Sequence, residues 1–220
     1  MHVAVDIKFC GLTRPLDAAL VGPLGGAYAG VVLASGPRRL DAARAALVLD
    51  ALTPGVKRAA VFGPQRVDEI ADLSRRLRLD VAQLHDAPSP DTVRALRQAL
   101  DSPTAVWAVV RVSDAQAAAH SIAELDGVAD GILLDAAAAG SLGGSGVAFD
   151  WSAFPAHAQP RRSTFIVAGG LTPANVAGAV RTFHPDVVDV SSGIERTRGV
   201  KDRELMSAFA RAVLLESQRV

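Results

Sequence analysis

The chain has 220 residues, of which 50% are hydrophobic and 21% are charged, a composition typical of a globular protein with a substantial core. Its 23 basic and 23 acidic residues balance, so the charge gives no support to a nucleic-acid or membrane-surface partner. The single cysteine rules out an internal disulfide, and neither a signal-peptide pattern nor a membrane-spanning apolar run is present, so we expect a cytoplasmic protein.

Short apolar runs alternate with longer segments of helical periodicity along the chain. Leu40, Ala43 and Leu47 fall at helical spacing, for example, and Thr172-Pro173 is a typical helix start. The apolar runs predict strands over residues 3–9, 29–34, 57–62, 80–84, 105–110, 129–134, 163–168 and 186–191. The periodic segments predict helices over residues 15–22, 40–52, 66–77, 90–101, 114–125, 173–182 and 202–216.

Strands that alternate with helices indicate a parallel sheet with right-handed crossovers. With eight such units, we expect closure into a single (β/α)8 TIM barrel, and an open doubly wound sheet is the alternative. The interval 136–162 is irregular and glycine-rich, with only a short helical turn expected near 150–154, so the sixth helix is predicted to be short or irregular. No linker or shift in composition divides the chain, so residues 1–220 are expected to form one domain.

The residues at the strand ends indicate acid–base chemistry, because barrel active sites lie at the carboxyl ends of the strands. The first strand leads to Cys10 and the sixth to Asp135, which are the candidate acid–base pair. A base requires the thiolate, and Lys8 shares the face of the strand with Cys10. Taken alone, a lone cysteine also fits a small buried apolar side chain, and a strand-end aspartate also fits a helix cap.

The turns after the last two strands are typical of a phosphate site. Glycine lets backbone N–H groups approach an anion closely, although turns also need glycine for conformational reasons. The candidate ligand-binding residues at the strand ends are Gln83, His85, Gly169, Gly170, Asp189, Ser191, Ser192 and Gly193. No cluster of His, Cys, Asp and Glu has metal-ligand spacing, and no dinucleotide fingerprint follows the first strand, so we expect no metal.

Six stretches match a known family pattern in order. They are residues 8–14, 82–85, 133–136, 143–146 followed by 149–152, 168–173 with 175–176, and 188–195 with 199–202. With these motifs the chain resembles phosphoribosylanthranilate isomerase, the TIM-barrel enzyme of tryptophan biosynthesis.

The resemblance implies an Amadori rearrangement of N-(5-phosphoribosyl)anthranilate without a cofactor. Cys10 falls at the position of the family's general base, Asp135 at that of the general acid, and Arg38 at that of the arginine that meets the anthranilate. The glycine and serine turns match the phosphate loops. The expected partner is therefore a small phosphorylated sugar–anthranilate substrate, with a monomer as the default and a homodimer as the alternative.

The sequence departs from the family pattern at Tyr28, Gly63, Asp86 and Val147, which bears on substrate fit. Two other functions are weighed. The related aminoaldose isomerase of histidine biosynthesis is disfavoured, because that family is expected to have aspartate where this chain has Cys10. A non-catalytic barrel that binds a phosphorylated ligand is disfavoured by the presence of both Cys10 and Asp135.

Overall fold

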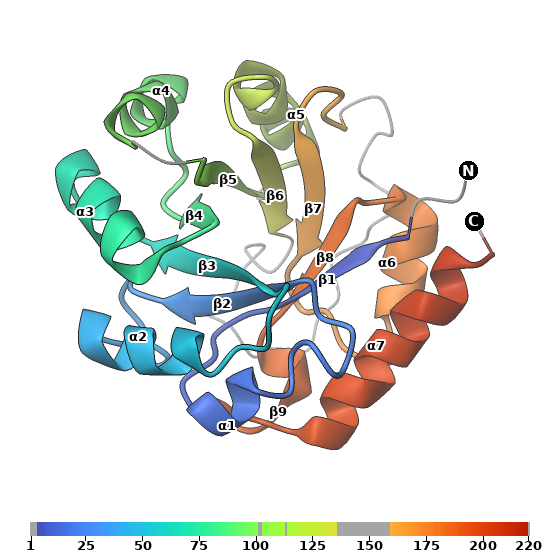
Figure 1. Ribbon diagram of the computed structural model, residues 1–220. Helices are drawn as coiled ribbons and strands as arrows, with labels where there is room; N and C mark the ends of the chain where they lie inside the picture. Colours follow the sequence, from blue (N-terminus) through green and yellow to red (C-terminus); the bar gives the residue numbers. More distant parts are fainter. Residues whose placement is uncertain (1–3, 101–102, 113, 136–158, 220) are drawn as a thin grey trace.

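The structure, a computed structural model, describes residues 4–100, 103–112, 114–135 and 159–219. In this part of the chain, eight parallel strands close into a barrel in sequence order, with β8 bonded back to β1 (Figure 1). The closure confirms the TIM barrel and excludes the open doubly wound sheet. The strands are β1 (Asp6–Phe9), β2 (Tyr28–Val32), β3 (Lys57–Phe62), β4 (Val81–Leu84), β5 (Ala105–Arg111), β6 (Gly131–Asp135), β7 (Thr164–Ala168) and β8 (Val187–Val190).

Helices surround the barrel and bury one face against the strands (Figure 1). In α3, for example, Ile70, Ala71 and Leu77 are buried, and they recur at the spacing of one helical face. The helices of the described residues are α1 (Pro15–Ala18), α2 (Ala42–Asp50), α3 (Val67–Leu77), α4 (Pro90–Ala99), α5 (Ala115–Leu125), α6 (Val176–Phe183) and α7 (Arg203–Ser217). None of them is both long enough and apolar enough to cross a membrane.

The segment after β8 contains elements that the sequence did not predict. A 3-10 turn, η4 (Ser192–Ile194), leads into β9 (Glu195–Thr197), which pairs antiparallel with β10 (Val200–Lys201) before α7 begins. Strands of three and two residues are too short to give a periodic signal.

The predicted strands agree with the observed ones to within three residues at each end, and the two largest differences among the helices are of four residues at α1 and three at α6. The helix predicted over 15–22 ends at Ala18, because Gly22, Pro23 and Gly25 follow in a series of turns. The helix predicted from residue 173 begins at Val176, because Asn175 Oδ1 accepts a hydrogen bond from the Thr172 N–H at 2.7 Å and closes a turn there. The short sixth helix and the turn near 150–154 lie outside the described residues.

An apolar layer fills the amino-terminal half of the barrel interior. The rings of Tyr28 and Trp107 pack with centroids 5.0 Å apart, together with Leu133 and Ile166. Gly131 makes room for this layer, because a Cβ there would lie 2.6 Å from Trp107 Cδ1. The buried polar residues Lys8, Gln83 and Asp189 each lie at the third position of a four-residue strand, toward its carboxyl end.

A Gly131→Ala substitution is expected to lower the free energy of unfolding by about 1–3 kcal/mol, because the new methyl group overlaps the Trp107 indole. Chemical denaturation monitored by circular dichroism measures the change.

Gly178→Ala is the matched control. Gly178 lies in α6 with nothing within 4 Å of an added Cβ, so this variant is expected to be neutral or more stable by roughly 0.5–1 kcal/mol. Equal effects of the two substitutions would contradict the tight packing at Trp107.

Candidate active site

A cleft of about 260 Å³ lies at the carboxyl-terminal end of the barrel, where the strands turn toward their helices. The barrel brings nearly all the predicted site residues together around this cleft. Those lining it are Cys10, Arg38, Gln83, His85, Asp135, Gly169, Gly170, Asp189, Ser191 and Ser192. Asp135 ends β6 and Cys10 follows β1, so β7 and β8 with their glycine and serine loops lie between them around the barrel.

Cys10 is held firmly at the end of β1. Its backbone N–H donates to the Val190 carbonyl at 2.8 Å, and its side chain is buried. Gly30 on β2 leaves room for it, because a Cβ there would lie 2.9 Å from Cys10 Sγ. Burial raises the pKa of the Cys10 thiol, as does the negative charge of Asp189, while Lys8 and Lys201 act in the opposite direction without overcoming them. The thiol therefore keeps its proton at neutral pH in the ligand-free structure.

Lys8 is a buried cation that the sequence did not assign to the site. It lies directly opposite Asp189 in the β1–β8 ladder, and its Nζ donates to Asp189 Oδ2 at 2.8 Å. The Lys8 side chain is fully buried. Burial lowers the pKa of its ammonium, but the charge and the hydrogen bond of Asp189 act in the opposite direction, and the pKa is raised overall. Lys8 is therefore charged. A lysine inside an apolar strand was the sequence signal for it.

Three buried polar atoms in the described part of the chain have no hydrogen-bond partner there. They are Gln83 Oε1, His85 Nδ1 and Asp189 Oδ1, and all three residues line the cleft. An unpaired buried polar group costs about 1–3 kcal/mol, so a polar ligand that pairs with these atoms would recover that cost. Burial lowers the pKa of His85 although Asp135 opposes the shift, so the imidazole is neutral near pH 7.

The loops after β7 and β8 pack tightly against each other. Gly169 and Gly170 both have positive φ, at 93° and 65°, which favours glycine. Gly193 does not line the cleft; a Cβ there would lie 1.9 Å from the Leu171 carbonyl oxygen. Gly193 thus allows the two loops to approach, and Gly169 and Gly170 lie at the cleft itself.

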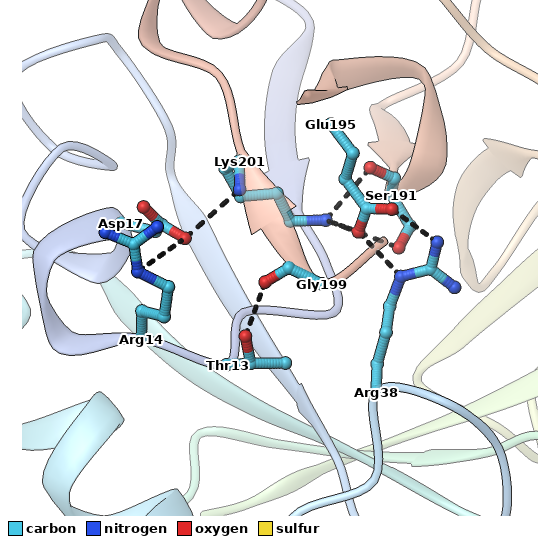
Figure 2. Close-up of polar contacts among 8 residues, drawn as sticks. All are labelled: Thr13, Arg14, Asp17, Arg38, Ser191, Glu195, Gly199 and Lys201. Carbon is cyan, nitrogen blue, oxygen red and sulfur yellow. Dashed lines mark hydrogen bonds and ion pairs between the residues drawn. The ribbon is translucent and has the colours of Figure 1, made fainter. Parts of the chain in front are cut away.

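Figure 2 shows a polar network that joins Glu195 and Lys201 of the β9–β10 hairpin to Arg38 and Ser191. Arg38 and Ser191 line the cleft. Glu195 accepts two hydrogen bonds from Arg38, each at 2.6 Å, and one from Lys201 Nζ at 2.9 Å. Lys201 Nζ also donates to the Ser191 carbonyl at 2.9 Å, and its backbone N–H donates to Asp17. Burial pushes the pKa of Glu195 up, but the bonds from Arg38 and Lys201 outweigh it and lower the pKa. The network fixes Arg38 at the rim of the cleft.

Neither Glu195 nor Lys201 was predicted as a site residue, although both lie in a matched motif. Their signal was only the charged pair spaced six residues apart after the last strand. Elsewhere, no cluster of three or more His, Cys, Asp and Glu suited to a metal ion occurs among the residues that the structure describes.

The family model of N-(5'-phosphoribosyl)anthranilate isomerase matches residues 7–212. The enzyme of that name from Acidithiobacillus ferrooxidans is 38% identical over 210 residues, which cover 95% of this chain and 97% of the relative. The chain belongs to this family. Its membership confirms the predicted isomerase and the predicted place in tryptophan biosynthesis.

Solved structures of the family have the same fold. The phosphoribosyl anthranilate isomerase of Thermotoga maritima superimposes with a TM-score of 0.84 at 29% identity, covering 95% of this chain and 98% of that one. A second structure was solved with reduced 1-(o-carboxyphenylamino)-1-deoxyribulose 5-phosphate bound; it has a TM-score of 0.76 at 26% identity, with the same coverage.

None of the three departures that fall in the described part of the chain is a lining residue of the cleft. Tyr28 is in the apolar layer, where its hydroxyl accepts a hydrogen bond from Lys57 at 3.1 Å. Gly63 and Asp86 are not among the lining residues, and Val147 lies outside the described part of the chain.

Glu195→Gln is expected to lower the free energy of unfolding at pH 7 by about 3 kcal/mol, because it leaves the buried Lys201 and the half-buried Arg38 without their counter-charge. The pKa of Glu195 is lower in the folded state than in the unfolded state. The Glu195 carboxylate therefore contributes its full stabilisation above the unfolded-state pKa, and this stabilisation is lost as the pH falls through the folded-state pKa. The difference in unfolding free energy between the parent protein and Glu195→Gln should therefore become smaller at acidic pH. Urea denaturation at pH 7 and at acidic pH would measure it.

Asp72→Asn on α3 removes a carboxylate from an exposed ion pair and serves as the control. Its expected effect is less than about 0.5 kcal/mol. An equally small effect of Glu195→Gln would contradict a structural role for the Arg38–Glu195–Lys201 network.

Proposed function

We propose that this chain converts N-(5'-phosphoribosyl)anthranilate into 1-(2-carboxyphenylamino)-1-deoxyribulose 5-phosphate, with Cys10 as general base and Asp135 as general acid. The observation that carries the proposal is that Cys10 and Asp135 line one cleft from opposite sides of the two loops suited to phosphate. Family membership supports the reaction, as does the related structure that holds a reduced form of this product.

The chemistry needs one acid and one base. Asp135 donates a proton to the ring oxygen of the ribose as the bond from that oxygen to carbon 1 breaks, and the nitrogen lone pair forms a Schiff base. Cys10, which becomes the thiolate by releasing its own proton to water, then removes the proton from carbon 2 and leaves an enolamine. Tautomerisation moves the enol proton away and adds a proton at carbon 1, giving the ketone. No electrons are exchanged with any other molecule, so the chain's own side chains suffice.

The remaining lining residues suit the rest of the substrate. Gly169, Gly170 and the Ser191–Ser192 pair offer backbone N–H groups and hydroxyls at the loops for the phosphate. Arg38, oriented by Glu195, supplies a fixed guanidinium for the anthranilate carboxylate. Gln83, His85 and Asp189 hold the unpaired polar atoms that suit the sugar hydroxyls.

Purified protein is expected to consume N-(5'-phosphoribosyl)anthranilate, seen as loss of the substrate's fluorescence. Cys10→Ser and Asp135→Asn should each lower kcat by roughly 10²–10⁴-fold, because each removes one proton-transfer group. Asp114→Asn, at the exposed N-cap of α5, is the matched control and should keep full activity, since asparagine caps a helix as well as aspartate.

No turnover by the parent protein would overturn the proposed reaction. Full activity of either site variant would overturn the role assigned to that residue alone.

A further inference from the structure

The interior of the barrel holds a cation between two groups that can both become negative. Lys8 is on β1 and Cys10 follows the strand two residues later, so their side chains lie on the same inner face, and Asp189 faces Lys8 from β8. Lys8 Nζ donates to Asp189 Oδ2 at 2.8 Å, and its positive charge acts on the neighbouring Cys10 thiol. Gly30 gives space to both side chains of β1, because a Cβ there would lie 2.9 Å from Cys10 Sγ and 3.3 Å from Lys8 Cε.

A fully buried ammonium requires a counter-charge, because its desolvation costs several kcal/mol. Asp189 meets this requirement with one carboxylate oxygen, Oδ2, while its Oδ1 has no partner among the described residues and the residue lines the cleft. An apolar side chain at position 8 would fill the barrel without any such cost. The pair is therefore better explained by what it does for its neighbour Cys10 than by stability.

We propose that Lys8 is a positioning residue that stabilises the Cys10 thiolate: its ammonium neutralises Asp189 in the resting protein and pairs with the sulfur once Cys10 has lost its proton. This inference rests on the proposed function, in which the thiolate is the base. Lys8 is not among the residues that line the cleft, so it acts through Cys10 rather than on the substrate.

The charges around Cys10 come from three strands and one loop, and they act in both directions. Asp189 on β8 raises the pKa of the thiol, whereas Lys8 on β1 and Lys201 on β10 lower it. Arg38, between β2 and α2, also interacts with the Cys10 charge. Lys8 lowers the pKa of the Cys10 thiol more than Lys201 does, and the Lys8 and Cys10 side chains lie together against Gly30.

The pH dependence of Cys10 alkylation by iodoacetamide tests this directly, because the chain has no other cysteine and only the thiolate reacts. Lys8→Met should shift the titration to higher pH and slow alkylation about 10-fold or more at a fixed alkaline pH, which corresponds to one pKa unit. Asp189→Asn should shift it to lower pH and speed alkylation by a similar factor, because the repulsion is removed and Lys8 is left to the sulfur.

Lys57→Met is the matched control, since it removes a lysine at the amino-terminal end of β3, beside Tyr28 rather than Cys10. The pH dependence of Cys10 alkylation in Lys57→Met should match that of the parent protein. Lys8→Met with a native circular-dichroism spectrum and an unshifted titration would overturn the proposal. If Lys8→Met does not fold, Asp189→Asn decides alone: faster alkylation supports the proposal, and an unchanged or slower rate overturns it.

Steady-state kinetics separates this inference from the proposed function. Lys8→Met should lower kcat with little change in KM and move the pH profile of kcat/KM in parallel with the alkylation titration. If Lys8→Met shifts the alkylation titration but the parent protein shows no turnover, the role of Lys8 is supported and the proposed reaction is overturned. If the parent protein turns over substrate but Lys8→Met leaves the alkylation titration unshifted, the proposed reaction is supported and the role of Lys8 is overturned.

Discussion

The closure of the barrel between β1 and β8 is the constraint on which the site depends. The β1–β8 ladder sets Lys8 opposite Asp189 inside the barrel, and the next inward position on β1 is Cys10. Because an isolated charge in this interior is costly, the lysine and the aspartate are stable only as a pair. The hydrogen bonds that complete the fold therefore also set the electrostatic surroundings of the thiol.

The apolar packing inside the barrel and the residues of the cleft lie at different positions along the barrel axis. Tyr28, Trp107 and their apolar neighbours fill the amino-terminal half, so the strands that end in Cys10 and Asp135 rest on a packed base. Unpaired polar atoms occur at the other end, around the cleft, where a ligand can satisfy them. The Arg38–Glu195–Lys201 network extends this ordered region to the rim and ties the last strand's loop to the hairpin that follows it.

The sequence by itself determined the repeating architecture and most of the lining of the cleft. Apolar runs and helical periodicity are local properties, so eight strands could be located without knowledge of their contacts. Parallel strands in a barrel end on one face, so Cys10, Asp135 and the glycine turns could be expected to meet there. The errors at α1 and α6 came from turn chemistry, such as the side-chain bond of Asn175, which periodicity does not detect.

Only the tertiary structure decided which charges meet. The sequence shows Lys8 in an apolar strand, but its partner lies 181 residues away and is chosen by the register of the closing strands. In the same way, Glu195 orients Arg38, and Gly193 is required by the approach of Leu171, which the packing of two loops imposes. Pairings between distant residues depend on how the sheet closes, and that is a property of the whole barrel rather than of any segment.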